Sequence, residues 1–289
     1  MNYRQQPGTR LAGIVGGIRG FDDLPFSPRA QDLLATRGRR IARRRPASEV
    51  RELARRHNPG GSGETVVPEV VDRMAEFEQR FSGLWYSILR EGENGMEYLL
   101  EEGTVYQTGF GPAFRGIMDG SWTTPLYILH DGRTLVRPGG QRPDRVIDSS
   151  VIQRIESHAL LAAAGHWPHY RYILAVAPGA EPAVGTGTFP PAVPAATGPA
   201  DRWWLDGDRA VLLRLFPWGF RRRTASGWTV TGLDRWTMWC FARTESGLAW
   251  AAARRADIPG DPVAESDWCV ICARSTPETA SCRPAADSP

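Results

Sequence analysis

The stretch from Pro68 to Leu89 constrains the fold more than any other part of the chain, because it joins a helical pattern to a strand pattern through one glycine. Apolar side chains recur at the spacing of one helix face, at Val70, Met74, Phe77 and Phe81. Proline is tolerated in the first turn of a helix and glycine is common just beyond the last, so Pro68 and Gly83 bound this helix. Leu84 to Leu89 predicts a strand. We therefore expect a core helix joined to a core strand by a tight corner.

Further strand signals follow this corner. Asp131-Gly132 lies between the apolar runs PLYILH and RTLVRP, which predicts a two-residue hairpin. Ser150 and Gln153 match a capping box at the start of a helix, and Gly165 ends that helix. Helix, strands and helix thus occur in blocks. This order is typical of an α+β fold rather than of alternating βαβ units.

Composition divides the chain into five parts. The first is a helical N-terminal extension with helices over Pro28–Thr36 and Ser48–His57, where Ser48 is the expected N-cap. An α+β domain follows, and then a Pro/Ala/Gly-rich linker that lacks periodicity and cannot bury much. A small Trp-rich α+β unit and a disordered tail complete the chain. The expected bounds are 1–63, 64–176, 177–200, 201–275 and 276–289.

Charge and hydropathy exclude some classes of protein. No apolar run approaches the roughly 20 residues that cross a bilayer, and the short run Leu11 to Ile18 reads as a strand rather than a signal peptide. We therefore expect a cytoplasmic protein with no membrane partner. The net charge of +3 gives little support for nucleic-acid binding by the whole chain. The basic run from Arg37 to Arg45 leaves a basic nucleic-acid-associated regulator as an alternative.

Four segments occur in a fixed order along the middle of the chain: FEQRFSGLWY from Phe77, NGMEY from Asn94, YILHDGRTL from Tyr127 and VIDSSVIQRIESHALL from Val146. Together they resemble the SUKH superfamily, in particular its actinobacterial branch around immunity proteins. The resemblance spans about residues 66–165. Ser82 replaces the first glycine of the usual Gly-Gly pair, and Ile147-Asp148 replaces the usual Ile-Ala.

The resemblance implies a mixed sheet flanked by helices. It also implies a protein that binds partners and performs no chemistry, because many members are thought to neutralise toxin domains by covering their active sites. We therefore expect a non-enzymatic immunity protein without a cofactor, whose partner is a toxin domain. The family's motif residues are structural, so the resemblance supplies no binding residue. The Trp-rich hairpin and helix are expected to extend this fold at the C-terminus.

The tryptophans supply the candidate contact residues, because exposed tryptophan is a favoured interface anchor. Eight of the eleven lie after residue 200. Trp203 and Trp204 are adjacent on one expected strand, so one should face outward unless both faces of the sheet are covered. Trp218 is expected on a loop tip beside Arg221 and Arg222, a cluster suited to an acidic partner. Core packing is the alternative for these tryptophans.

The cysteines and histidines offer a second kind of function. Trp268-Cys269-Val270-Ile271-Cys272 resembles a thiol-redox motif, but the β-branched middle residues favour a strand, on which the two thiols point apart. Cys269 and Cys272 also form half of a zinc site, with no second half in the sequence. His158, His166 and His169 are near one another in sequence without a carboxylate at helical spacing. A redox or zinc-binding protein therefore remains an alternative to partner binding.

Overall fold

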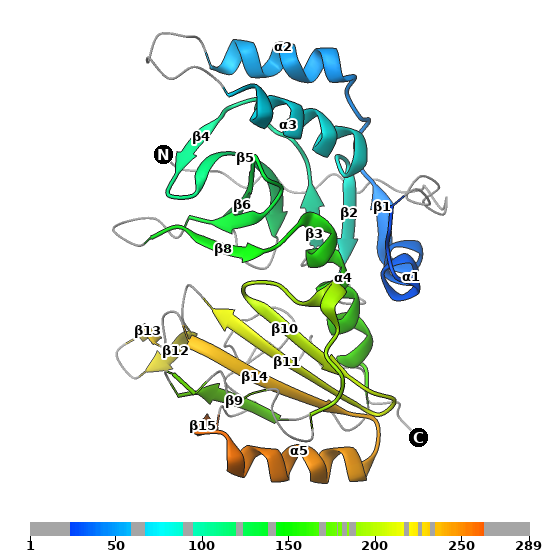
Figure 1. Ribbon diagram of the computed structural model, residues 1–289, viewed down its shortest axis with the longest axis vertical. Coiled ribbons are helices and arrows are strands. Elements are labelled where there is room, and N and C mark those ends of the chain that lie inside the picture. The colour runs from blue at the N-terminus through cyan, green and yellow to red at the C-terminus, as the bar shows by residue number, and fades with distance from the viewer. Residues whose placement is uncertain are drawn as a thin grey trace.

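The computed structural model describes most of the chain from Leu24 to Pro262. Two antiparallel sheets lie on either side of one long helix, α4, with α2 and α3 at one end of the molecule and α5 at the other (Figure 1). The predicted α+β class is confirmed. No helix within the described ranges is long and apolar enough to cross a bilayer. Those ranges are 24–58, 67–88, 95–119, 124–137, 143–167, 172–177, 179–180, 184, 189–216, 220–224, 227–231 and 235–262.

The larger sheet has eight strands in the order β1-β2-β3-β5-β6-β7-β8, with β4 paired to β5. Each of its described pairs is antiparallel, so the expected mixed sheet is wrong in this respect. Most of its neighbouring strands are also close in sequence, and a short connection can join only antiparallel strands. The strands are β1 (Gly38–Arg40), β2 (Leu84–Ser87), β3 (Gly95–Tyr98), β4 (Tyr106–Thr108), β5 (Gly111–Asp119), β6 (Thr124–Leu129), β7 (Thr134–Val136) and β8 (Arg145–Asp148).

The smaller sheet has five strands in the order β10-β11-β14-β9-β15, and β12 and β13 form a separate hairpin. Its fourth strand, β9, belongs to the part of the chain predicted as the α+β domain, residues 64–176. Composition alone therefore does not locate the edge of this sheet. The strands are β9 (Tyr172–Val176), β10 (Asp201–Leu205), β11 (Arg209–Phe216), β12 (Phe220–Thr224), β13 (Gly227–Thr231), β14 (Arg235–Ala242) and β15 (Gly260–Pro262).

The helices begin and end close to their sequence signals. The Ser150 side chain accepts a hydrogen bond from the Gln153 amide at 3.1 Å, which is one half of the expected capping box. The Gln153 side chain accepts from the Ser149 amide rather than from the Ser150 amide. The expected Ser48 cap is wrong, because the helix begins one residue earlier and Pro46 occupies the N-cap position without a side-chain bond. The helices are α1 (Pro28–Arg37), α2 (Ala47–His57), α3 (Pro68–Arg80), α4 (Val151–Ala164) and α5 (Glu245–Asp257), with a 3-10 turn, η2 (Pro194–Ala196).

The largest buried cluster spans both sheets and the helix between them. It contains Phe114 of the larger sheet, Leu161 of α4 and Trp239 of the smaller sheet. A second cluster, with Val211 and Ala251, lies between the other face of the smaller sheet and α5. Both faces of the smaller sheet are therefore covered.

The expected linker is packed where the structure describes it. Ala196 and Ala200 are buried, and the Gln153 side chain of α4 donates to the Ala196 carbonyl at 3.0 Å. Ala192 forms a β-bridge with Trp204, and the Val193 amide donates to the Trp203 carbonyl. Residues 189–200 are thus tied to β10 by backbone bonds and to α4 by the Gln153 side chain, and such bonds need no apolar periodicity. These residues are therefore bonded to the fold rather than free of it, although only Pro190, Ala196 and Ala200 among them are buried.

The corner after α3 depends on the backbone of Gly83. Its φ of +78° lies in the left-handed region, which side chains other than glycine rarely adopt. Its amide donates to the Tyr98 carbonyl at 2.7 Å, and its carbonyl accepts from the Ile41 amide at 2.7 Å. A Cβ added here would lie 2.3 Å from the Ala42 carbonyl oxygen. The corner therefore requires glycine both for its conformation and for the close approach of the neighbouring chain.

Gly83→Ala should lower the free energy of unfolding by about 2 kcal/mol or more, because it adds left-handed strain to a backbone contact that cannot move aside. Gly109→Ala is the matched control, since a Cβ at Gly109 meets nothing within 4 Å. We expect the control to stay within about 0.5 kcal/mol of the wild type. Urea unfolding of the three proteins measures the difference, and equal midpoints for both variants would contradict the role of Gly83.

Candidate functional site

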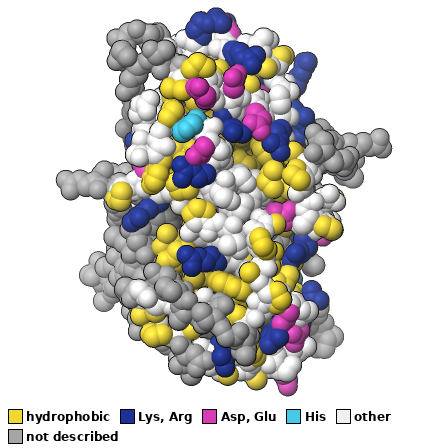
Figure 2. All heavy atoms as spheres, viewed as in Figure 1, with side chains coloured by type: hydrophobic (Ala, Val, Ile, Leu, Met, Phe, Trp, Pro, Cys, Tyr) yellow, Lys and Arg dark blue, Asp and Glu magenta, His cyan; other side chains and the backbone are white. Residues whose placement is uncertain are grey.

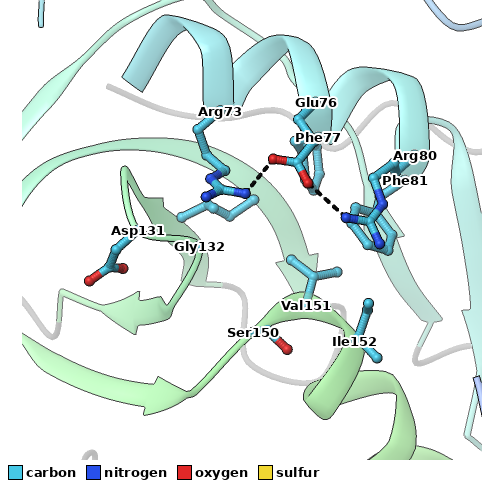
Figure 3. A pocket seen from close by; sticks show the side chains of 11 residues that line it. Arg73, Glu76, Phe77, Arg80, Phe81, Asp131, Gly132, Ser150, Val151 and Ile152 are labelled. Carbon is cyan, nitrogen blue, oxygen red and sulfur yellow. Dashed lines mark hydrogen bonds and ion pairs between the residues drawn. The ribbon is translucent and has the colours of Figure 1, made fainter. Parts of the chain in front are cut away.

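A groove lies between α3 and the first turn of α4, beside the turn of the β6–β7 hairpin (Figure 3). Its volume is about 120 Å³. Pockets for cofactors and drug-sized ligands run to about 300–1,000 Å³, so this groove suits a single side chain better than a cofactor. It is lined by Arg73, Glu76, Phe77, Arg80, Phe81, Ile128, Asp131, Gly132, Ser150, Val151 and Ile152.

The floor of the groove is apolar because α3 places two phenylalanines one turn apart. The ring centroids of Phe77 and Phe81 lie 5.9 Å apart, and Phe77 also meets Phe114 of β5 edge-on at 5.7 Å. The first turn of α4 supplies Val151, which is buried, and Ile152, which is half-buried. A side chain entering the groove would therefore meet an apolar surface held by the core.

The rim of the groove carries paired charges from α3. The Glu76 carboxylate accepts hydrogen bonds from Arg73 and, at 2.7 Å, from Arg80 (Figure 3). Arg73 Nε also donates to the His130 carbonyl at 3.1 Å, which ties α3 to the hairpin. The rim thus combines two guanidinium groups with one carboxylate from the same helix. In Figure 2, basic and acidic side chains are likewise interspersed over the end of the molecule where α2 and α3 lie.

Sequence reasoning missed this groove. The periodicity of α3 places Arg73, Glu76 and Arg80 on a polar helix face and gives no sign that a hairpin turn lies against them. One signal was present: the end of α3, the hairpin turn and the start of α4 belong to three of the four segments that resemble the SUKH superfamily. The fold brings these three segments together at the groove.

Behind the groove, α4 carries polar side chains that are buried and hydrogen-bonded. The Ser157 hydroxyl donates to Asp201 of β10 at 2.6 Å and accepts from the Trp203 indole at 2.9 Å. Arg214 of β11 donates to both oxygens of Asp201, each at 2.7 Å. Burial alone would raise the pKa of Asp201, but the charge and hydrogen bonds of Arg214, with the bond from Ser157, lower it. This network attaches α4 to the smaller sheet.

A second buried network attaches α4 to the larger sheet. Arg154 lies 3.1 Å from Asp148 of β8, and Thr134 of β7 donates to the same carboxylate. Burial raises the pKa of Asp148 more than Arg154 and Thr134 lower it. The charged form of Asp148 therefore depends on both partners. These groups serve the packing of α4 and face no open cavity that the structure describes.

The described histidines do not form the metal cluster considered from the sequence. His158 Nδ1 lies 2.8 Å from the Tyr86 hydroxyl, which in turn lies 2.9 Å from the Tyr98 hydroxyl, all in the core. His166 lies instead beside Arg37, at 2.9 Å, and His169 falls outside the described residues. In the part of the chain that the structure describes, no three His, Cys, Asp or Glu side chains are placed to hold a metal.

The arginines of the basic run are largely engaged within the fold. Arg37 donates to the Ile88 carbonyl and Arg40 to the Ser82 carbonyl. Arg45 binds both the buried Glu78 carboxylate and the Leu100 carbonyl. Three of the arginines expected for the nucleic-acid alternative therefore hold α3, the chain on either side of β2 and the chain after β3.

The tryptophan prediction needs one correction. Trp203 is fully buried, with its indole bonded to Ser157, so it is not available to a partner. Trp204 points to the other face of the smaller sheet, as predicted, and is half-buried with its ring centroid 5.7 Å from that of Phe189. Trp203 therefore belongs to the core, whereas Trp204 keeps part of its surface exposed.

The other expected contact residues are only partly described. Trp218 falls outside the described residues. Arg221 and Arg222 lie on β12, paired with β13, and their side chains are not described. Cys269 and Cys272 also fall outside the described residues. Cys240 is a buried free thiol whose pKa burial raises to about 12, so it is a poor thiolate ligand or nucleophile.

Comparisons of the chain with protein-family models, curated proteins and solved structures found no match. The resemblance to the SUKH superfamily therefore stays a prediction, and the groove rests on its own geometry.

His158 makes the stability of the protein depend on pH. Burial, with Arg154 and Arg214 nearby, holds its pKa well below the usual value. Below about pH 6.5 the unfolded chain takes up a proton on this imidazole while the folded chain does not. Stability should therefore fall as the pH drops from 7 to 5, by about 1.4 kcal/mol per pH unit below 6.5 from this group.

The control is His158→Gln, whose side chain can still hydrogen-bond to Tyr86 but does not titrate. We expect its thermal midpoint to change less between pH 7 and 5 than that of the wild type. The raised pKa of Asp148 and the lowered pKa of Asp201 act in both proteins and cancel in the comparison. Parallel curves for the two proteins would show that His158 does not carry this dependence.

Proposed function

We propose that the chain is a non-enzymatic protein-binding module, and that it acts as an immunity protein by covering the active site of a toxin domain. The observation that carries the proposal is the groove between α3, the β6–β7 turn and α4. Its small volume, apolar floor and charged rim suit a side chain projecting from another protein. The core holds its walls in place, as a contact surface requires.

The placement of the titratable groups supports the same proposal. His158, Asp148 and Asp201 are all buried, and each is bonded to a partner that holds α4 in place. Their roles are therefore accounted for by packing rather than by a reaction with a substrate. The resemblance to immunity proteins supplies the nature of the partner, a toxin domain, and the mechanism is steric and electrostatic occlusion without turnover.

The test begins with a tagged pull-down from the organism that encodes the chain, with the co-purifying proteins identified by mass spectrometry. A stoichiometric partner is then expressed alone and together with the full chain in a laboratory host. We expect the partner to stop growth when expressed alone and the chain to restore it, with a dissociation constant of about 1 nM or below. A partner that does not inhibit growth of the host, or a chain that does not restore that growth, would contradict the immunity function.

Thiol titration and metal analysis of the purified full chain test the alternative at Cys269 and Cys272. We expect slowly reacting thiols and no stoichiometric zinc. Reactive low-pKa thiols, or one bound zinc per chain, would favour the redox or zinc-binding alternative over partner binding.

A further inference from the structure

We infer that the groove between α3 and α4 receives an apolar side chain of the partner that lies next to a carboxylate. This inference rests on the proposed protein-binding function and specifies the chemistry of its contact. It names what the partner must present, and so it can fail while the proposed function stands.

The floor of the groove favours an apolar side chain. Phe77, Phe81 and Val151 form a surface that the core keeps in place, and Ile152 is the half-buried side chain beside them. With about 120 Å³ available, one aliphatic or aromatic side chain fills the space without a rearrangement. Burial of such a side chain removes apolar surface of both proteins from water.

The preference for a carboxylate beside that side chain comes from the charges around the groove. Arg73 and Arg80 share the single carboxylate of Glu76, while Asp131 is already paired with Arg133 at 2.7 Å. These three arginines and two carboxylates together leave one excess positive charge. An incoming lysine or arginine would find both lining carboxylates, Glu76 and Asp131, already paired with arginines. An incoming carboxylate can bind a guanidinium without breaking either of these pairings.

Arg80 is the better candidate to bind that carboxylate. Arg73 already holds both Glu76 and the His130 carbonyl, which fixes it to the hairpin. Arg80 bonds to Glu76, lies over the Phe81 ring at 5.3 Å and keeps a third of its side chain exposed. Its guanidinium therefore lies at the border between the apolar floor and solvent. A carboxylate next to the inserted apolar side chain would meet it there.

The first turn of α4 adds to the same preference. It contributes Ser150, Val151 and Ile152 to the lining and contains no acidic residue. The positive end of the helix dipole is therefore not offset by a carboxylate of its own first turn. The helix dipole therefore adds positive potential to the groove, as the excess positive charge of the arginines does.

Four blocked dipeptides separate the two halves of the inference: acetylated and amidated leucyl-aspartate, leucyl-asparagine, leucyl-lysine and glycyl-aspartate. Their blocked termini leave only the side-chain charges. Binding to the full chain is followed by NMR, through the backbone amide shifts of Gly132 and Ile152. We expect leucyl-aspartate to bind about tenfold more tightly than leucyl-lysine, with leucyl-asparagine between them and glycyl-aspartate weakest. Tightest binding by leucyl-lysine, or no shift at the groove with leucyl-aspartate, would overturn the inference.

Two charge-reversal variants supply the matched comparison. Arg80→Glu and Arg55→Glu each break an arginine pair with a glutamate one turn earlier on the same helix, but Arg55 lies on α2, away from the groove. We expect Arg80→Glu to reverse the order of leucyl-aspartate and leucyl-lysine, and Arg55→Glu to leave it unchanged. The reversal requires a folded groove, so loss of folding cannot imitate it. The same order of dipeptide affinities in the two variants would contradict the role of Arg80.

The native partner separates this inference from the proposed function. Arg80→Glu should weaken binding of the full chain to that partner by tenfold or more, whereas Arg55→Glu should not. If both variants bind and protect like the wild type, the groove inference fails and the immunity function stands. If no partner binds the wild type at all, the proposed function fails, while the order of the dipeptides still reports on the groove.

Discussion

The burial of α4 between two sheets is the constraint on which the rest of the structure depends. A helix in this position is normally apolar all round, yet α4 carries Arg154, Glu156, Ser157 and His158 inside the core. Each of them has a partner from a different element: Asp148 of β8, the Ser27 N-cap of α1, Asp201 of β10 and Tyr86 of β2. A buried charge or polar group left without its partner costs several kcal/mol, so α4 is stable only where all four partners meet it. The network therefore specifies how the two sheets and α1 are placed, even though each bond adds little net stability.

This placement determines the groove. Ser150 and Val151 begin the same helix whose later turns are bonded to both sheets, so the first turn of α4 cannot shift without disturbing those bonds. On the opposite wall, the buried Glu78 of α3 binds Arg45, and Arg73 reaches the hairpin turn. The walls are therefore held before any partner arrives. Preorganised contact surfaces lose less conformational freedom on binding, which favours affinity.

Local signals in the sequence predict much of the fold, and non-local pairing explains the rest. The Ser150 cap, the hairpin at Asp131-Gly132 and the stripe on α3 depend on residues within a few positions, and the structure has all three. The hairpin loop is longer than the predicted two residues, because the last paired residues are Ile128 and Thr134. The sequence of β5 shows no regular strand period, because its register shifts between Arg115 and Ile117. The burial of Trp203 depends on α4, whose Ser157 bonds to its indole across the face of the smaller sheet. No short window of sequence contains that information.

The same non-local packing explains why tryptophans and arginine runs are ambiguous signs of a contact surface. Tryptophan is a common interface residue, but a sheet covered on both faces uses it as core, and Trp203 and Trp204 lie on such a sheet. Arginine runs suggest an acidic partner, but Arg37, Arg40 and Arg45 bind carbonyls of the fold. A guanidinium carries five donors in a rigid planar arrangement and so can join several backbone segments at once, which a single ammonium does less well. In a chain whose basic residues are all arginine, a charge run is therefore a weak sign of a surface. A pair of arginines that share one carboxylate at a cavity, as on α3, indicates an anion site more directly.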